Sequence, residues 1–182
     1  MTFLEQIQNQ KSKLETTETV VRKLDFFVED KTKDDIPMEI IPGIYLGSYQ
    51  AAENEKELKK LGITHILNFF FDPLGYDWAI EKQCKCLDIE IFPIDKFFVE
   101  SHQFIDQALE NGKVLVNCWQ GASRSATIVI SYLMKTQKKN FEETYRFVKN
   151  KRKAVQPNRG FQKILQNYEK ELFADEEKEK EN

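Results

Sequence analysis

Hydrophobic residues recur along the chain with two spacings, and each spacing predicts its own kind of element. Short apolar runs between turn residues predict strands. They lie in EIIPGIYLGS, around a turn at Pro42-Gly43, in ITHILNFFF, at 86–92 and at 113–117. Apolar residues three and four positions apart predict helices. These lie at 54–61 with a stop at Gly62, around 104–109, from 125 through SYLMK, after the Asn140–Glu143 capping pattern and after Pro157-Asn158.

The order of these elements predicts the fold class. Strands alternate with helices along most of the chain, and this alternation is typical of a mainly parallel sheet with helices on both faces. No internal repeat of 20 to 50 residues is visible. We therefore expect an α/β domain in which a phosphate-type loop connects one strand to one helix.

Composition divides the chain into three parts. These are a helical extension at 1–36, a compact domain at 37–173 and a charged tail at 174–182. Apolar residues of the extension, such as Phe3, Ile7 and Leu14, share one helical face. Two interpretations of this face stay open. The helix lies on its own domain, or it binds a partner or a second copy of the chain.

Total charge and cysteine content exclude several classes of protein. The 182 residues carry a formal net charge of −3, so a nucleic-acid partner is not expected. Three cysteines, an odd and small number, argue against a disulfide framework and for a reducing compartment. No apolar run has the length of a membrane span, and no secretory signal or lipidation pattern is visible. We expect a cytoplasmic protein, with the nucleus as a second location.

The stretch LVNCWQGASRSATIVI carries the candidate chemistry. Cys118 ends one apolar strand, and Arg124 begins the next helix. In such sheets ligands bind beyond the carboxyl ends of the strands. A tight loop followed by a helix N-terminus directs backbone N–H groups at an anion, and an arginine fork holds two oxygens at once. The pattern therefore predicts a site for a phosphate-sized dianion.

The same positive field favours the ionised form of the Cys118 sulfur, which is then a nucleophile. Sulfur and phosphate in one cradle indicate attack of sulfur on phosphorus. The alternative is a buried structural cysteine with Arg124 in a surface ion pair. The order strand, cysteine, loop, arginine, helix favours the nucleophile.

These residues resemble a known family. CWQGASR, followed by Ser125, is similar to the phosphate loop of protein tyrosine phosphatases, and its surroundings resemble the dual-specificity branch. The supporting segments occur in the family's order. They are IYLGS at 44–48, LGITHILNF at 61–69, FIDQAL at 104–109, SYLMK at 131–135 and QPNRGF at 156–161. The resemblance covers residues 38–173.

The resemblance implies a role for each residue of the loop. Cys118 attacks phosphorus, Arg124 holds two phosphoryl oxygens, and Ser125 donates a hydrogen bond to the sulfur when it leaves. Backbone amides hold the remaining oxygens; they belong to Trp119, Gln120, Gly121, Ala122, Ser123 and Arg124. Water then hydrolyses the phosphocysteine. Neither a metal nor an organic cofactor is expected.

A general acid must protonate the leaving oxygen. The family carries an aspartate on a loop before the FID-type helix, and Asp95 in FPIDKFF stands at that place. A helix or turn cap is the other interpretation of Asp95. Asp88 is a weaker candidate, because the pattern places it within a strand. The stretch from Asp95 to Phe104 is shorter than is usual in the family.

Three further positions bear on the site. Asn117 stands where the family has histidine, and Gln120 stands where a small residue is common. Asparagine hydrogen-bonds but carries no positive charge, so slower turnover is expected. Asn68 supports the loop from a neighbouring strand or caps the end of its own strand. His65 and His102 are scattered, with His102 expected on a helix surface, so a metal site has no support.

Two functions from different classes follow. The first is a phosphoprotein phosphatase acting on phosphotyrosine and on phosphoserine or phosphothreonine, with a phosphorylated protein as substrate. The second is a catalytically weak phosphatase-fold module that binds phosphoproteins or scaffolds a protein kinase. Asn117 and the short acid segment favour the second. The nucleophile and the arginine favour the first.

Overall fold

The computed structural model describes residues 34–180 of the chain, with side chains through residue 174. The predicted apolar face at Phe3, Leu4, Ile7 and Leu14 lies outside the described residues. Asp34 and Asp35, which the sequence assigns to the extension, contact the compact domain. The Ser48 hydroxyl donates to the Asp34 carbonyl at 2.6 Å, and the Asn54 amide donates to the Asp35 carbonyl at 2.9 Å.

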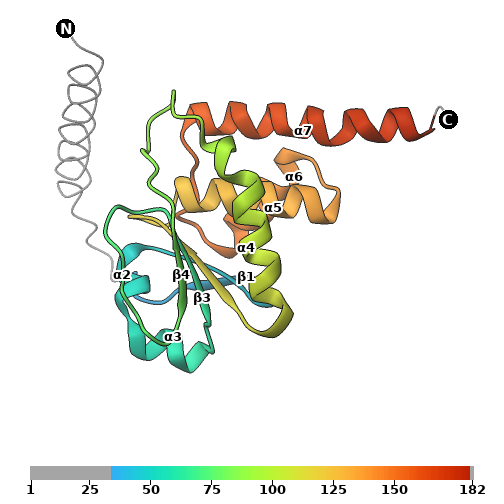
Figure 1. The fold of residues 1–182 in the computed structure, drawn as a ribbon. Helices are drawn as coiled ribbons and strands as arrows, with labels where there is room; N and C mark the ends of the chain where they lie inside the picture. The colour runs from blue at the N-terminus through green and yellow to red at the C-terminus, as the bar shows by residue number, and fades with distance from the viewer. Residues whose placement is uncertain (1–33, 181–182) are drawn as a thin grey trace, which may run out of the picture. The chain divides into compact units, whose positions relative to one another are not determined.

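A five-stranded sheet in the order β1-β2-β5-β3-β4 forms the centre of the domain (Figure 1). Its strands are β1 (Met38–Ile41), β2 (Ile44–Gly47), β3 (His65–Asn68), β4 (Ile80–Gln83) and β5 (Val114–Asn117). Only the β1–β2 pair is antiparallel, while β2, β5, β3 and β4 pair in parallel. The predicted mainly parallel sheet is confirmed.

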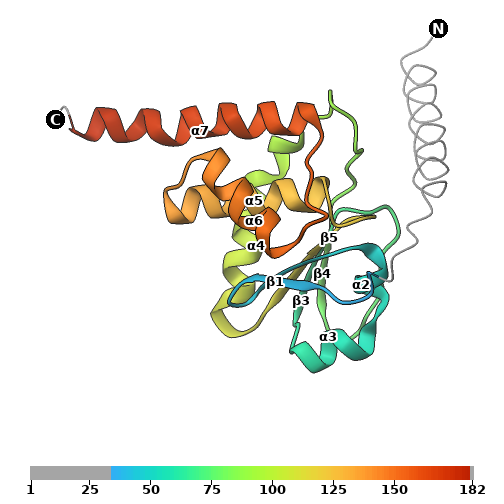
Figure 2. The same cartoon turned by 180° about the vertical axis from the view of Figure 1, so that it is seen from behind.

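Helices cover both faces of the sheet (Figures 1 and 2). The helical elements are α2 (Tyr49–Glu53), α3 (Glu55–Leu61), η1 (Ile94–Phe97), α4 (Phe98–Asn111), α5 (Arg124–Gln137), α6 (Phe141–Lys151) and α7 (Arg159–Lys180). One face carries α3, and the other carries α4, α5 and α6. No helix within residues 34–180 is long and apolar enough to cross a membrane.

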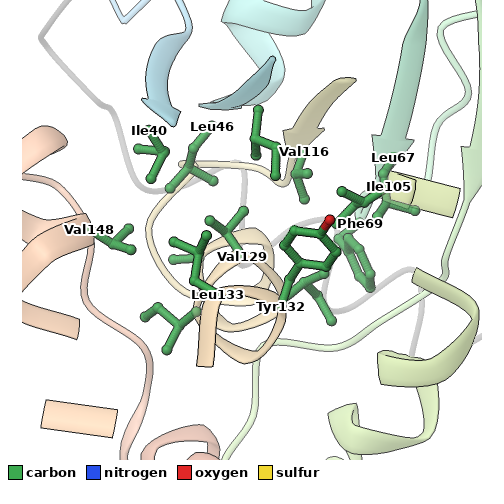
Figure 3. Packing of buried hydrophobic residues seen from close by; sticks show 14 of the residues in the cluster. Ile40, Leu46, Leu67, Phe69, Ile105, Val116, Val129, Tyr132, Leu133 and Val148 are labelled. Carbon is green, nitrogen blue, oxygen red and sulfur yellow. The ribbon is translucent and has the colours of Figure 1, made fainter. Parts of the chain in front are cut away.

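Alternating residues of the strands face two separate hydrophobic clusters. Val114 and Val116 belong to the larger cluster, whereas Leu115 between them belongs to the smaller one. The larger cluster joins the sheet to α5 and α4 (Figure 3). Every residue of α5 from Arg124 to Met134 is buried. The helix that follows the candidate loop is therefore the central helix of the domain and holds the loop rigidly.

Several local signals act as the sequence predicts. The Asn140 side chain caps α6 by accepting from the Glu143 amide at 2.9 Å. Asn54 caps α3 in the same way, at 3.3 Å from the Glu57 amide. Gly62 ends α3 with φ at +75°, a left-handed conformation that glycine adopts without a steric cost.

Two element predictions are wrong. The strand expected at 86–92 does not form, and the strand lies earlier, at Ile80–Gln83. The apolar alternation arises because Cys84 and Cys86 are buried in the core, while Ile91 is 90% exposed. At the other end, α7 continues to Lys180, through most of the segment expected as a charged tail.

His102, expected on a helix surface, is buried in α4. Its Nε2 lies 2.9 Å from Ser131 Oγ, and the hydroxyl of Ser131 donates to the Ile128 carbonyl. Ser131 Oγ therefore accepts from Nε2–H of a neutral ring. Phe98, Tyr132 and Tyr168 surround the imidazole. Burial, with a smaller effect of Lys135, lowers the pKa of His102 from 6.5 to about 4.

This burial predicts a loss of stability in mild acid. The unfolded chain binds a proton at His102 near pH 6.5, but the folded chain binds it only near pH 4. The free energy of unfolding that depends on neutral His102 is fully present above pH 6.5 and is lost as the pH falls towards 4. Between pH 7 and pH 5 the loss is about 2 kcal/mol. Urea unfolding of the wild type and of His102→Gln, which still donates to Ser131, measures it.

The variant His65→Gln, at the half-buried second histidine, is the matched control and keeps most of the wild-type pH dependence. If His102→Gln loses as much stability as the wild type between pH 7 and pH 5, the buried imidazole is not the cause.

Candidate active site

The candidate loop leaves the sheet at its central strand. Asn117 ends β5, Arg124 begins α5, and Cys118 is only 1% exposed between them. The hydroxyl of Ser125 donates to the Cys118 sulfur at 3.1 Å. The structure therefore brings the expected nucleophile and its hydrogen-bond donor together at the carboxyl end of the strand.

The carbonyl groups of the loop all point away from its centre. Those of Trp119 and Ala122 accept from the backbone amides of Tyr49 at 3.0 Å and Gln156 at 2.8 Å. The Arg152 side chain donates to the carbonyls of Gln120 and Gly121, and the Thr127 amide donates to that of Ser123. In a planar trans peptide the C=O and the next N–H point in opposite directions. The amides of residues 120–124 are therefore directed inward and form an anion-binding nest.

Gly121 allows the loop to turn so tightly. Its φ is +63°, and a Cβ built on it lies 2.4 Å from the backbone of Gly47. Any larger residue displaces either the loop or β2. Glycine at position 121 is thus a steric requirement of the loop.

Arg124 is the largest fully buried side chain and is held from several sides. Its Nη1 donates to the carbonyls of Phe69 at 3.3 Å and Cys86 at 3.2 Å. Its Nε lies 3.5 Å from Asp88 Oδ2. The guanidinium is therefore positioned beside the loop before any substrate arrives, which reduces the cost of reorganisation during catalysis.

Asp88 is the carboxylate that contacts the loop. It lies in the segment after β4, not in a strand, and its Oδ1 accepts from Ser123 Oγ at 2.7 Å and from Asn158 Nδ2 at 2.8 Å. Asn158 is itself oriented, because its Oδ1 accepts from the Phe161 amide at 2.9 Å. Asp95 lies in η1 with its side chain exposed.

Asn68 makes contacts of both kinds that its two interpretations describe. Its Oδ1 accepts from the Phe70 amide at 3.0 Å, just beyond the end of its own strand β3. The Asn117 amide donates to Asn68 Oδ1 at 3.0 Å. The Asn68 amide in turn donates to Glu81 Oε1 and to the Asp72 carbonyl, both at 2.9 Å. The buried Oδ1 of Asn117 has no hydrogen-bond partner among the described residues. A buried acceptor without a hydrogen-bond partner lowers the free energy of unfolding.

A cavity of about 600 Å³ adjoins the outer side of the loop. Gln120 and Ser123 of the loop, Asp88, and Asn158 and Arg159 at the start of α7 line it. Gln120, which replaces the usual small residue, therefore borders this cavity.

The other two cysteines differ from Cys118 in their surroundings. Burial raises the pKa of Cys84 to about 12 and raises that of Cys86 still further. Both thiols therefore stay protonated at neutral pH. Among the residues that the structure describes, no cluster of three His, Cys, Asp or Glu side chains could hold a metal ion.

A cysteine at the end of a central parallel strand, a loop with inward amides and a buried arginine at the next helix are together the arrangement typical of cysteine-dependent phosphatases. Comparison with known proteins gives the family. Residues 44–171 match the model of the dual specificity phosphatase catalytic domain. The chain belongs to the dual-specificity phosphatase family.

Individual relatives agree with this assignment. The chain is 42% identical over 144 residues to MAP kinase phosphatase with leucine-rich repeats protein 3 of Dictyostelium discoideum, covering 76% of this chain and 16% of that protein. It is 39% identical over 142 residues to dual specificity protein phosphatase 1 of Arabidopsis thaliana, covering 76% and 72%.

A solved structure is similar as well. The human tyrosine phosphatase-like serine/threonine/tyrosine-interacting protein superposes with a TM-score of 0.71 at 34% identity, covering 73% of this chain and 95% of that one.

The sequence pattern placed Asp88 within a strand and did not reveal the loop contacts of Asp88 and Arg152. Asp88 seemed unsuitable only because its segment resembled a strand. Arg152 lies 31 residues from Gly121 in the chain, and nothing in its own neighbourhood indicates a contact with the loop. Asn158, which the pattern places before the last helix, also orients Asp88.

The unpaired amide oxygen of Asn117 leads to a test. Replacing Asn117 with histidine removes the unpaired acceptor and places N–H donors, and a charge when protonated, at the position that precedes Cys118. Relief of one unpaired buried acceptor beside the loop, worth about 1 kcal/mol, corresponds to an increase of about fivefold in kcat if the better-held loop stabilises the transition state. Steady-state kinetics with an aryl phosphate, together with the rate of Cys118 alkylation by iodoacetate, measure the effect. Unchanged rates in both assays contradict it.

Proposed function

We propose that this chain hydrolyses phosphoproteins, with phosphotyrosine and phosphoserine or phosphothreonine as substrates and a phosphocysteine as intermediate. The observation that carries the proposal is the outward orientation of the loop carbonyls around Cys118, which turns the amides of residues 120–124 toward one centre. Inward amides and the Arg124 fork match the three equatorial oxygens of a transferring phosphoryl group.

The first step transfers the phosphoryl group to sulfur. The Cys118 thiolate attacks phosphorus, an S–P bond forms, and the bond between phosphorus and the substrate oxygen breaks. In the second step water attacks phosphorus and the S–P bond breaks, which releases phosphate. The hydroxyl of Ser125, at 3.1 Å from the sulfur, stabilises the thiolate as it leaves.

Asp88 is the proposed general acid, in preference to Asp95. Its carboxyl group contacts Ser123 and Asn158 and lies beside Arg124, so it borders the place where the leaving oxygen departs. In the first step Arg124 holds two phosphoryl oxygens, and the Asp88 carboxyl group, in its protonated form, gives its proton to the leaving oxygen. In the second step the same carboxylate accepts a proton from the attacking water.

Relatives suggest the substrate class and partners. The Dictyostelium relative is named a MAP kinase phosphatase, which supports a phosphorylated protein kinase as one substrate. A catalytic thiolate requires a reducing compartment, so the cytoplasm, and the nucleus besides, are the proposed locations. Residues 1–36 are the proposed partner-binding extension.

The binding-module alternative is not favoured. Two observations support it. The name of one human structural neighbour calls that protein phosphatase-like and interacting, and Asn117 replaces the usual histidine in this chain. Against it, this chain has the cysteine, the serine that donates to its sulfur and the arginine at the start of α5, which are the residues that the phosphatase reaction needs.

Hydrolysis of p-nitrophenyl phosphate by the wild type and by Cys118→Ser tests the proposed function. We expect turnover by the wild type and none by the variant, because serine is not ionised at neutral pH and the loop has no other nucleophile in this position. The Cys118→Ser variant retains the cradle and so still binds phosphopeptides. Equal background rates with retained phosphopeptide binding in both proteins would instead identify a binding module.

Paired variants identify the acid. Asp88→Asn is expected to lower kcat at mildly acidic pH by roughly 10²–10⁴-fold, because the leaving oxygen then departs without a proton. The loss is larger for phosphoserine or phosphothreonine peptides than for p-nitrophenyl phosphate, whose leaving group needs little protonation. Asp95→Asn, an equal change at an exposed site, is the control and changes kcat by less than threefold. If Asp95→Asn lowers kcat more than Asp88→Asn does, Asp95 is the general acid instead.

A further inference from the structure

Arg152, the first residue after α6, reaches from outside into the back of the phosphate loop. Its side chain is 6% exposed. Its Nε donates to the Gly121 carbonyl and its Nη2 to the Gln120 carbonyl, both at 2.9 Å. Two neighbouring peptide groups of the loop are thus held by one guanidinium.

These two peptide groups differ from the others in the loop. The carbonyls of Trp119, Ala122 and Ser123 accept from backbone amides, which the surrounding chain holds in place. The carbonyls of Gln120 and Gly121 accept from a side chain. They flank Gly121, whose φ of +63° belongs to a residue with wide conformational freedom. Rotation of either peptide would point a carbonyl oxygen at a bound phosphate and remove an amide from the cradle.

A carboxylate from the other end of the domain orients Arg152. Asp34 accepts from Nη1 at 2.9 Å and also from Nη2, so the pair is bidentate. Asp34 is anchored in turn, because its own carbonyl accepts from Ser48 Oγ at 2.6 Å. The Asp34 side chain is 21% exposed and that of Arg152 is 6% exposed, so water screens this pair less than a surface ion pair.

We propose that Asp34 and Arg152 are positioning residues for catalysis. The ion pair holds the Gln120 and Gly121 peptides with their amides inward and thereby sets the affinity of the loop for oxyanions. The inference rests on the proposed function for its effect on turnover, but its effect on anion binding stands independently. It also assigns a role at the active site to a residue that composition places in the N-terminal extension.

The test uses the full-length chain with Asp34→Asn and Arg152→Lys, and with Asp35→Asn as the matched control. Asp35 carries the neighbouring carboxylate, and it is the backbone carbonyl of Asp35, not this side chain, that accepts from the Asn54 amide. Two quantities are measured for each protein. They are the affinity for inorganic tungstate, a phosphate-shaped dianion, by calorimetry, and kcat and KM for p-nitrophenyl phosphate.

We expect Asp34→Asn and Arg152→Lys each to weaken tungstate binding and to lower kcat/KM by about tenfold or more, which is the usual effect of losing a charge-assisted hydrogen bond. Lysine presents one ammonium and cannot hold two carbonyls and a carboxylate in one plane. Asp35→Asn stays within about twofold of the wild type in both assays. Asp34→Glu, which restores the carboxylate, recovers part of the lost affinity. The double variant Asp34→Asn/Arg152→Lys loses less than the product of the single losses, because both residues act through one contact.

The proposal is overturned if tungstate affinity is unchanged in Asp34→Asn, or if Asp35→Asn weakens it equally. If a variant of the pair has a lower melting temperature but unchanged tungstate affinity, the ion pair is purely structural, and this outcome also overturns the proposal. Should Asp34→Asn fail to fold, Arg152→Lys gives the same outcomes. A wild type that binds tungstate but does not hydrolyse p-nitrophenyl phosphate refutes the proposed function alone.

Discussion

The orientation of the peptide groups from Trp119 to Ser123 is the constraint on which the site depends. Each carbonyl has a partner outside the loop, and these partners come from the start of α2, from α5 and from the segment between α6 and α7. Because carbonyl and amide point in opposite directions within a peptide group, holding the oxygens outward leaves the N–H groups inward. In the proposed function these amides serve both the sulfur nucleophile and the phosphoryl group, so one arrangement supports both steps.

The fold places those partners around the loop. Strand β5 lies between β2 and β3, both parallel to it, so the segments after all three strands meet at one edge of the sheet. Tyr49 follows β2, Asn68 ends β3, and Cys118 follows β5. Helix α5 is buried along its first eleven residues, from Arg124 to Met134, which keeps the start of that helix and its guanidinium in a rigid setting.

Charged side chains complete the site from distant parts of the chain. Asp88 reaches the loop because the segment after β4 leaves the sheet and packs against the start of α7, where a Cβ on Gly160 would lie 1.8 Å from the Glu90 carbonyl oxygen. Asp34 and Arg152 are 118 residues apart and meet behind the loop. The acid side and the rear side of the cradle are therefore held by different contacts, and each can be altered separately.

The sequence alone determined the parallel sheet and the place of Cys118 and Arg124 between a strand and a helix, because these residues and the loop between them are local and apolar patterns report burial. It did not determine which aspartate contacts the loop, because the pattern CKCLDIEIF has the period of a strand although only the cysteines are buried. Nor could it reveal Arg152 or Asp34, whose side chains are ordinary in their local context. Only the tertiary structure decided these contacts, because they depend on chain segments that meet through packing rather than through spacing.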